Sequence, residues 1–242
     1  MPGPYIDFIS AYCDRWCERC AFTARCSNFA VSSALAMCDG NFEAAIELAI
    51  GPPRVPGGQP QQPLHERMAE ALAGFEPTEK ELEEVGREMD ARRARIETLA
   101  VAEASHDYAI AAHRWLRQYR DACGASDAGV QEALDVIAWD QVLIHVKIMR
   151  ALDGRDESPE GDFRDGGPIQ SDWNGSAKVA AISIARSERA WRAVAAATGN
   201  EAAGVLAASL AALGQQMSVE FPHAMEFRRP GFDEAAQGGG GR

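Results

Sequence analysis

The stretch TEKELEEVGREMDARRARIETLAVAEASHDYAIAAHRWLRQYRD, residues 78–121, decides the fold class of this chain. Thr78 followed by Glu81 forms a capping box, a pattern typical of helix starts. From there, a seven-residue repeat predicts one continuous stripe on the inner face of a long helix. The stripe consists of Leu82, Val85, Met89, Arg92, Ile96, Leu99, Glu103, His106, Ile110 and His113. We therefore expect a single helix over residues 78–121.

Three more helices are expected downstream, at residues 130–152, 176–198 and 201–220. Each has apolar residues at helical spacing and ends at a glycine-containing pair or at a proline. A long acidic loop is expected over residues 153–175. Four helices in succession predict a four-helix bundle.

The N-terminal part has a different composition. Residues 1–50 predict a small Cys-rich helical cap, with helices at 5–16, 29–37 and 42–50. Residues 51–65 are rich in Pro, Gly and Gln and predict a linker. Residues 66–235 then form the helical bundle, and residues 236–242 a disordered tail. The expected fold class is all-α.

Composition excludes several functional classes. The chain has 242 residues and a net charge of −12, which disfavours nucleic acid as a partner because phosphate binding requires clustered Lys and Arg. No apolar run reaches the ~18 residues that span a bilayer, and the N-terminus lacks the basic and apolar regions of a secretion signal. We therefore expect a cytoplasmic protein without a membrane partner. The motifs of the commoner enzyme classes are missing from the sequence, so whether the chain is an enzyme stays open.

The segment CDRWCERCAFTARC, residues 13–26, carries four of the six cysteines. In a reducing cytosol, such a group is more typical of a metal site than of disulfides. Helical spacing would place Cys13, Cys17 and Cys20 on one side, and Cys26 would close the site from the following turn. Thiolates suit both zinc and iron–sulfur clusters; several ligands within one short segment favour a [4Fe–4S] cluster. Buried thiols that pack as small apolar side chains are the alternative.

The sub-stretch from Cys17 to Cys26 resembles the C-x2-C-x5-C iron–sulfur element of RecB-like nucleases and of the auxiliary-cluster domains of radical-SAM maturases. The resemblance implies that Cys17, Cys20 and Cys26 are cluster ligands, with Cys13 as the natural fourth. It does not extend to the catalytic domains of those proteins. The body of the chain is similar to uncharacterised bacterial all-helical proteins that begin with such a segment.

A second candidate metal site lies on the predicted inner stripe. Glu103 and His106 have the E-x-x-H spacing that ferritin-like helices use. Antiparallel packing would bring them level with His145 and Glu220, giving a carboxylate–imidazole site. The alternative is that Glu103 pairs with Arg186 and that hydrogen bonds satisfy the histidines.

These observations predict a metal-centre-binding protein that holds a [4Fe–4S] cluster through Cys13, Cys17, Cys20 and Cys26, with a redox or sensing role and a protein partner. Two alternatives remain open. One is a structural zinc site in a protein–protein interaction module, and the other is a ferritin-like metalloenzyme in the bundle. The sequence does not indicate the oligomeric state.

Overall fold

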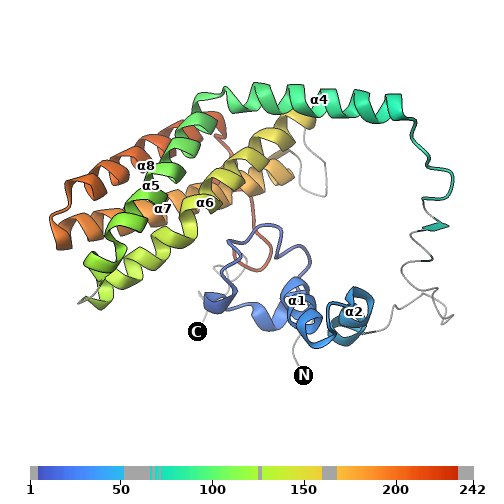
Figure 1. Cartoon of the computed structure of the whole chain (residues 1–242), viewed down its shortest axis with the longest axis horizontal. Helices are drawn as coiled ribbons and strands as arrows, with labels where there is room; N and C mark the ends of the chain where they lie inside the picture. Colours follow the sequence, from blue (N-terminus) through green and yellow to red (C-terminus); the bar gives the residue numbers. More distant parts are fainter. Residues whose placement is uncertain are drawn as a thin grey trace, which may run out of the picture. The chain divides into compact units, whose positions relative to one another are not determined.

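The computed structural model describes residues 5–51, 66, 69, 70, 72–124, 127–159 and 168–233. Within these residues the chain forms seven α-helices and four short 3-10 helices and no strand, which confirms the all-α prediction (Figure 1). Apart from Gly51, the predicted linker at 51–65 lies outside the described residues, as does the predicted tail at 236–242. The chain divides into two compact units. One contains Arg15–Arg87 and the residues before Tyr12, and the other contains Tyr12–Asp14 and the chain from Glu88 onward.

The first unit contains helices α1 (Ser27–Met37) and α2 (Phe42–Ile50), which pack against each other. Between them, Asp39 and Gly40 have positive φ angles of 49° and 82°, which a right-handed helix cannot contain. The Asn41 side chain accepts a hydrogen bond of 3.1 Å from the backbone N–H of Ala44 and caps α2. The predicted helix at 42–50 is thus confirmed, and the one at 29–37 begins two residues earlier than expected.

The helix predicted at residues 5–16 is wrong, because this segment consists of turns. Phe8 and Arg15 have φ angles of 59° and 60°, which interrupt any right-handed helix. The backbone N–H of Ile6 donates to the carbonyl of Arg25 at 3.0 Å, so it bonds to a distant part of the chain.

Helices α4 (Glu79–Glu97) and α5 (Ala100–Gly124) replace the single helix predicted at 78–121. The predicted capping box begins α4: Thr78 N–H donates to Glu81 at 2.8 Å, and Glu81 N–H donates to the Thr78 hydroxyl at 3.3 Å. The break falls at Thr98 and Leu99. The last carbonyl groups of a helix have no backbone partner within it. The Thr98 hydroxyl donates to one of them, the carbonyl of Arg95, at 2.7 Å.

The break changes which face of α5 is inward. Each residue turns a helix by about 100°, so the seven-residue pattern cannot be continued across two non-helical residues. The pattern read from α4 therefore no longer predicts which face of α5 points inward. The predicted inner residues Glu103, His106, Ile110 and His113 are exposed. The buried face lies about one position earlier and comprises Val101, Ala102, Ser105, Tyr108, Ala112, Trp115 and Leu116.

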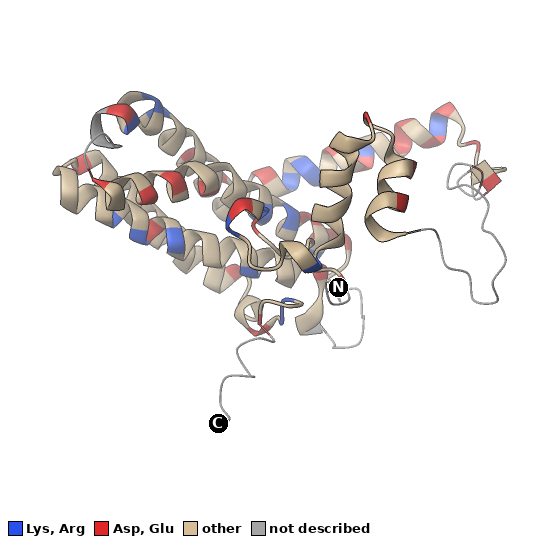
Figure 2. Ribbon diagram, turned by 90° about the horizontal axis from the view of Figure 1, so that it is seen from below, with Lys and Arg blue, Asp and Glu red and all other residues tan. Residues whose placement is uncertain are grey.

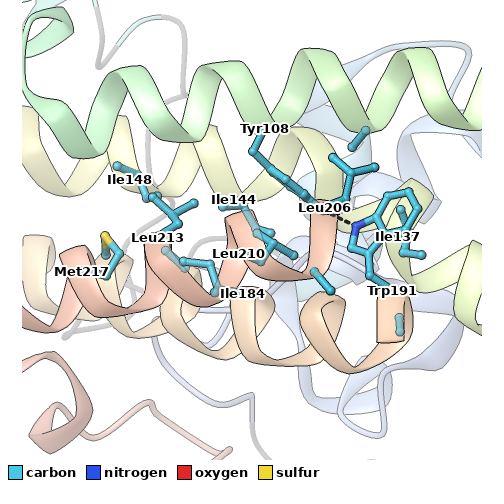
Figure 3. Packing of buried hydrophobic residues seen from close by; sticks show 14 of the residues in the cluster. Tyr108, Ile137, Ile144, Ile148, Ile184, Trp191, Leu206, Leu210, Leu213 and Met217 are labelled. Carbon is cyan, nitrogen blue, oxygen red and sulfur yellow. Dashed lines mark hydrogen bonds between the residues drawn. The ribbon is translucent and has the colours of Figure 1, made fainter. Parts of the chain in front are cut away.

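Helices α5, α6 (Ala128–Glu157), α7 (Asp172–Thr198) and α8 (Glu201–Glu220) share one hydrophobic core (Figures 1 and 3). Figure 3 shows residues from all four helices meeting there: Tyr108, Ile137, Ile144, Ile148, Ile184, Trp191, Leu206, Leu210, Leu213 and Met217. Burying one such large side chain contributes about 1.5–3 kcal/mol. The Trp191 indole N–H donates to the Tyr108 hydroxyl at 3.0 Å within this core.

The helix ends follow the chain's capping residues. Asp127 accepts hydrogen bonds from Gly129 and Val130 and begins α6, which continues to Glu157. Residues 153–157 of the predicted acidic loop are therefore helical, and residues 160–167 lie outside the described part. Gly199, with a φ of 67°, ends α7 as the sequence predicts. Helix α8 has the predicted bounds.

Figure 2 shows acidic and basic residues interspersed among a majority of other residues. At the end of α4, Arg95 pairs with Asp156 of α6 at 2.8 Å, and Arg92 lies 3.5 Å from Glu157. In the described residues, α8 is the one helix long and apolar enough to cross a membrane by length and composition. One of its faces lies in the core, with Leu206, Leu210, Leu213 and Met217 buried.

Candidate functional site

The cysteine segment is held in turns and in two one-turn 3-10 helices, Cys17–Arg19 and Thr23–Arg25. Cys13, Cys17, Cys20 and Cys26 are all half-buried. The predicted helical placement of the first three thiols is therefore wrong, since no α-helix begins before Ser27 in the described residues. The three thiols would lie on one face only if the segment were an α-helix. Their spacing in the sequence therefore does not by itself bring them together.

Two of these sulfur atoms accept backbone hydrogen bonds. The Phe22 N–H donates to Cys20 Sγ at 3.4 Å, and the Phe29 N–H donates to Cys26 Sγ at 3.5 Å. Cys26 thereby caps the N-terminus of α1. Hydrogen bonds of this kind stabilise the negative charge of a thiolate ligand and tune metal centres. Sequence spacing did not predict them.

The four cysteines are divided between the two units. Cys13 belongs with Tyr12 and Asp14, whereas Cys17, Cys20 and Cys26 belong to the first unit. Over the described parts of the chain, no three His, Cys, Asp or Glu side chains are grouped closely enough to hold a metal ion. Binding at the cysteine segment would thus require its side chains to rearrange.

The residues on either side of Cys13 make specific contacts within the second unit. The Tyr12 hydroxyl donates to Asp172 at 3.1 Å. Asp14 accepts a hydrogen bond of 2.7 Å from the guanidinium of Arg186, on α7. The backbone positions before and after Cys13 are therefore fixed to this unit.

A buried ion pair lies behind Asp14. Asp140, on α6, is fully buried and accepts hydrogen bonds from Arg186 at 2.6 and 2.9 Å and from the Ser187 hydroxyl at 3.2 Å. Burial raises the pKa of Asp140, and the hydrogen bonds and charge of Arg186 act in the opposite direction. The alternative prediction, that Arg186 pairs with Glu103, is corrected: its partners are Asp140 and Asp14. The sequence feature that could have predicted this ion pair is Asp140, an acidic residue among the apolar residues of α6.

His106 and His145 meet in the second unit, as the sequence predicts. Their ring centroids are 5.5 Å apart, with an edge-to-face angle of 61°. They line an open pocket of about 450 Å³ together with Glu103 and Met149. Glu103 and His106 are exposed side chains on α5, so this site lies on the surface and outside the core.

The tautomer of the neutral His145 ring follows from its neighbour Ser105. The Ser105 hydroxyl donates to the carbonyl of Ala102 at 2.8 Å and also lies 2.9 Å from His145 Nδ1. Because its proton is already used, the hydroxyl accepts from Nδ1–H, which leaves the Nε2 lone pair available. Burial lowers the pKa of His145, and the neighbouring His106 lowers it further, so the ring is neutral near pH 7.

Glu220, the fourth residue of the predicted carboxylate–imidazole site, has other partners. Its carboxylate pairs with Arg155 of α6, and its backbone carbonyl accepts a hydrogen bond of 2.7 Å from the same guanidinium. Glu220 is not part of the wall around His106 and His145. The structure therefore brings together Glu103, His106 and His145 of the predicted set.

The chain matches no protein-family model, no curated protein and no solved structure.

Proposed function

We propose that this protein binds a metal centre, most simply a [4Fe–4S] cluster, through Cys13, Cys17, Cys20 and Cys26. The observation that carries the proposal is four cysteines within fourteen positions, none of them fully buried. The backbone N–H donors at Cys20 and Cys26 support it, because they stabilise sulfur in its charged, ligating form. When bound, a cluster would supply one-electron transfer or redox sensing.

The backbone of this segment supports the proposal as well. Outside its two short 3-10 helices it has turns and extended residues, so closure around a centre would not require an α-helix to unwind. A structural centre commonly orders its ligand loop only on binding, and the binding free energy then contributes to folding. We therefore expect the segment to become more rigid in the loaded protein.

A zinc-stabilised interaction module is a second candidate, and the surface of the first unit favours it. Large apolar side chains of α1 and α2 are exposed: Met37 is 77% exposed, Leu48 59% and Phe42 55%. Exposed apolar residues of this kind are typical of protein–protein contact sites. In this version, zinc replaces the cluster on the same cysteines and a protein partner covers the apolar residues.

A ferritin-like enzyme using Glu103, His106, His145 and Glu220 is a third candidate. It requires Glu220 to leave Arg155 and join the histidines. We also infer that α5–α8 constitute a four-helix bundle and that residues 1–50 constitute a Cys-rich cap. The single core shared by the four helices supports the bundle. A cytoplasmic location fits reduced thiols, and the acidic charge disfavours nucleic acid as a partner.

Purification without air, followed by a visible spectrum and analysis of iron, zinc and sulfide, tests the proposal. We expect broad visible absorbance with iron and sulfide in the unmodified protein, and loss of both in Cys20→Ser. Cys38→Ser is the matched control, because Cys38 is a half-buried free thiol outside the segment. It should retain the centre.

The outcomes separate the candidates. Colourless protein that holds zinc and loses it in Cys20→Ser supports the interaction module. Iron retained in Cys20→Ser but lost in His106→Gln supports the ferritin-like enzyme. Folded protein that holds no metal, with all thiols reactive, overturns all three.

A further inference from the structure

His106 and His145 are spaced as two ligands of one metal ion would be. Metal–nitrogen bonds of ~2.0–2.1 Å place each imidazole centroid about 3.2 Å from the ion. At a tetrahedral angle the two centroids are then about 5 Å apart. The observed separation is 5.5 Å, which is close to the centroid separation expected for two imidazole ligands of one ion.

The hydrogen bonds around His145 prepare it for this role. Ser105 is fully buried and its hydroxyl is fixed by the carbonyl of Ala102, so it accepts the Nδ1 proton of His145. Metal-binding histidines almost always donate their second ring N–H to such a partner, which fixes the tautomer and the ring orientation.

The pocket also contains carboxylate and thioether side chains, which are metal ligands by type. Glu103 precedes His106 by three residues on α5, and Met149 follows His145 by four on α6, so each shares a face with its histidine. Glu97 and Asp107 also line the pocket. A carboxylate or a water would complete the coordination, because the described residues hold no third ligand already in place.

We propose that His106 and His145 form a binding site for a divalent transition-metal ion, completed by the carboxylate of Glu103. Imidazole ligands with carboxylate and thioether neighbours suit zinc, cobalt, nickel and copper, and disfavour magnesium and calcium, which require oxygen ligands. The site is independent of the cysteine segment, so it stands whether or not that segment holds a cluster or zinc.

Titration of the full-length protein with Co²⁺ tests the site, because cobalt reports its own ligands. Cobalt bound by imidazole and carboxylate shows weak visible bands, whereas cobalt bound by thiolates adds intense sulfur-to-metal charge transfer in the near ultraviolet. With the cysteine segment already loaded with its own centre, we expect one further equivalent to bind with visible bands and without charge transfer. His106→Gln and His145→Gln should each weaken binding at least tenfold, and Ser105→Ala about 10–100-fold as loss of an orienting partner.

His113→Gln is the matched control, because His113 is exposed on α5 two turns beyond His106. It should bind Co²⁺ like the unmodified chain, and circular dichroism should show all variants folded. Equal affinity in His145→Gln and the unmodified chain overturns the proposal. So does cobalt that shows only charge transfer and is lost in Cys20→Ser. That second result would leave the cysteine centre supported, so the two proposals fail separately.

Discussion

Arg186 donates two hydrogen bonds to the carboxylate of Asp140, at 2.6 and 2.9 Å, from one helix to the next in the second unit. A third bond, of 2.7 Å, reaches Asp14, the residue after Cys13. One guanidinium thus joins α6, α7 and the short segment that contains Cys13. A buried carboxylate of this kind is stable only while its cation is present.

Asp140→Ala should therefore destabilise the protein by about 3–5 kcal/mol, because it leaves Arg186 partly buried with one carboxylate instead of two. Urea denaturation followed by circular dichroism measures this loss. Asp107→Ala is the control, since the Asp107 side chain is 85% exposed, and it should change stability by less than ~0.5 kcal/mol. If the two variants unfold at the same urea concentration, the ion pair contributes nothing.

Replacing both partners separates the ion pair from simple packing. Asp140→Leu combined with Arg186→Met removes both charges, so no uncompensated charge stays buried. We expect the double variant to be more stable than Asp140→Leu alone, with a coupling energy of at least ~1 kcal/mol between the two sites. Additive effects in the double-mutant cycle would contradict this interpretation.

Gly175, near the start of α7, should not tolerate a side chain. A Cβ atom there would lie 2.4 Å from the ring of Tyr12 and 2.8 Å from that of Phe227. Both rings pack together, with centroids 4.6 Å apart, so neither can move away freely. Gly175→Ala should cost about 1–3 kcal/mol, as overpacking usually does. Gly204→Ala in α8 is the control.

Nothing lies within 4 Å of a Cβ at Gly204, and alanine is the better helix former. Gly204→Ala should therefore raise stability by up to ~1 kcal/mol. Thermal unfolding compares the two variants directly. A rise in Tm for Gly175→Ala would show that the Tyr12 ring is not fixed against α7.

Local signals in the sequence predicted what local forces determine. Helix α8 and the capping box of Thr78 and Glu81 were predicted correctly, because capping residues and glycine or proline act within one turn. The break at Thr98 was missed, since neither Thr98 nor Leu99 is a strong helix breaker. That miss placed His106 on the buried face, although the residue is exposed.

The candidate sites show the same limit. The proximity of His106 and His145 was predicted, because the lengths of two consecutive antiparallel helices determine which residues lie opposite each other. The pairing of Arg186 with Asp140 and Asp14 was not, since it joins residues far apart in the sequence. The helical alignment of the cysteines failed because the φ angle of Arg15 interrupts the helix on which it depended.

Acid should release the C-terminal segment that Asp233 holds. Lys178 donates to Asp233 at 2.7 Å and to the carbonyls of Met225 and Phe227. Burial alone would raise the pKa of Asp233, but the hydrogen bonds from Lys178 and Arg229 outweigh it and hold the pKa at about 2. The ordinary value is 3.8, so this contribution is complete above about pH 4 and is lost as the pH falls to 2.

Asp233→Asn should therefore lower stability at pH 7 by about 1–2 kcal/mol, a value reduced by the solvent that reaches this side chain. Between pH 4 and pH 2 the variant should lose less stability than the unmodified protein does. Chemical denaturation at several pH values in this range measures both effects. If stability depends on pH in the same way in both proteins, the charge of Asp233 beside Lys178 does not stabilise the folded protein.

His145 should make stability depend on pH near neutrality. Its pKa in the folded protein lies below the ordinary 6.5, because burial and the neighbouring His106 oppose its charge. The unfolded chain then binds more protons below pH 6.5, so stability is greatest above that value and falls as the pH drops through it. Glu97 of the pocket wall limits the loss because its negative charge favours the charged ring.

His145→Gln should flatten this slope between pH 7 and pH 5, whereas His113→Gln should keep it. Metal-free buffer with a chelator is essential, because a bound ion competes with protons for the same nitrogen and would steepen the dependence. Adding Co²⁺ to the unmodified protein should accordingly raise its stability more at pH 7 than at pH 5. A slope that is unchanged in His145→Gln would assign the pH dependence to another group and would remove the argument for a half-buried, neutral imidazole at this position.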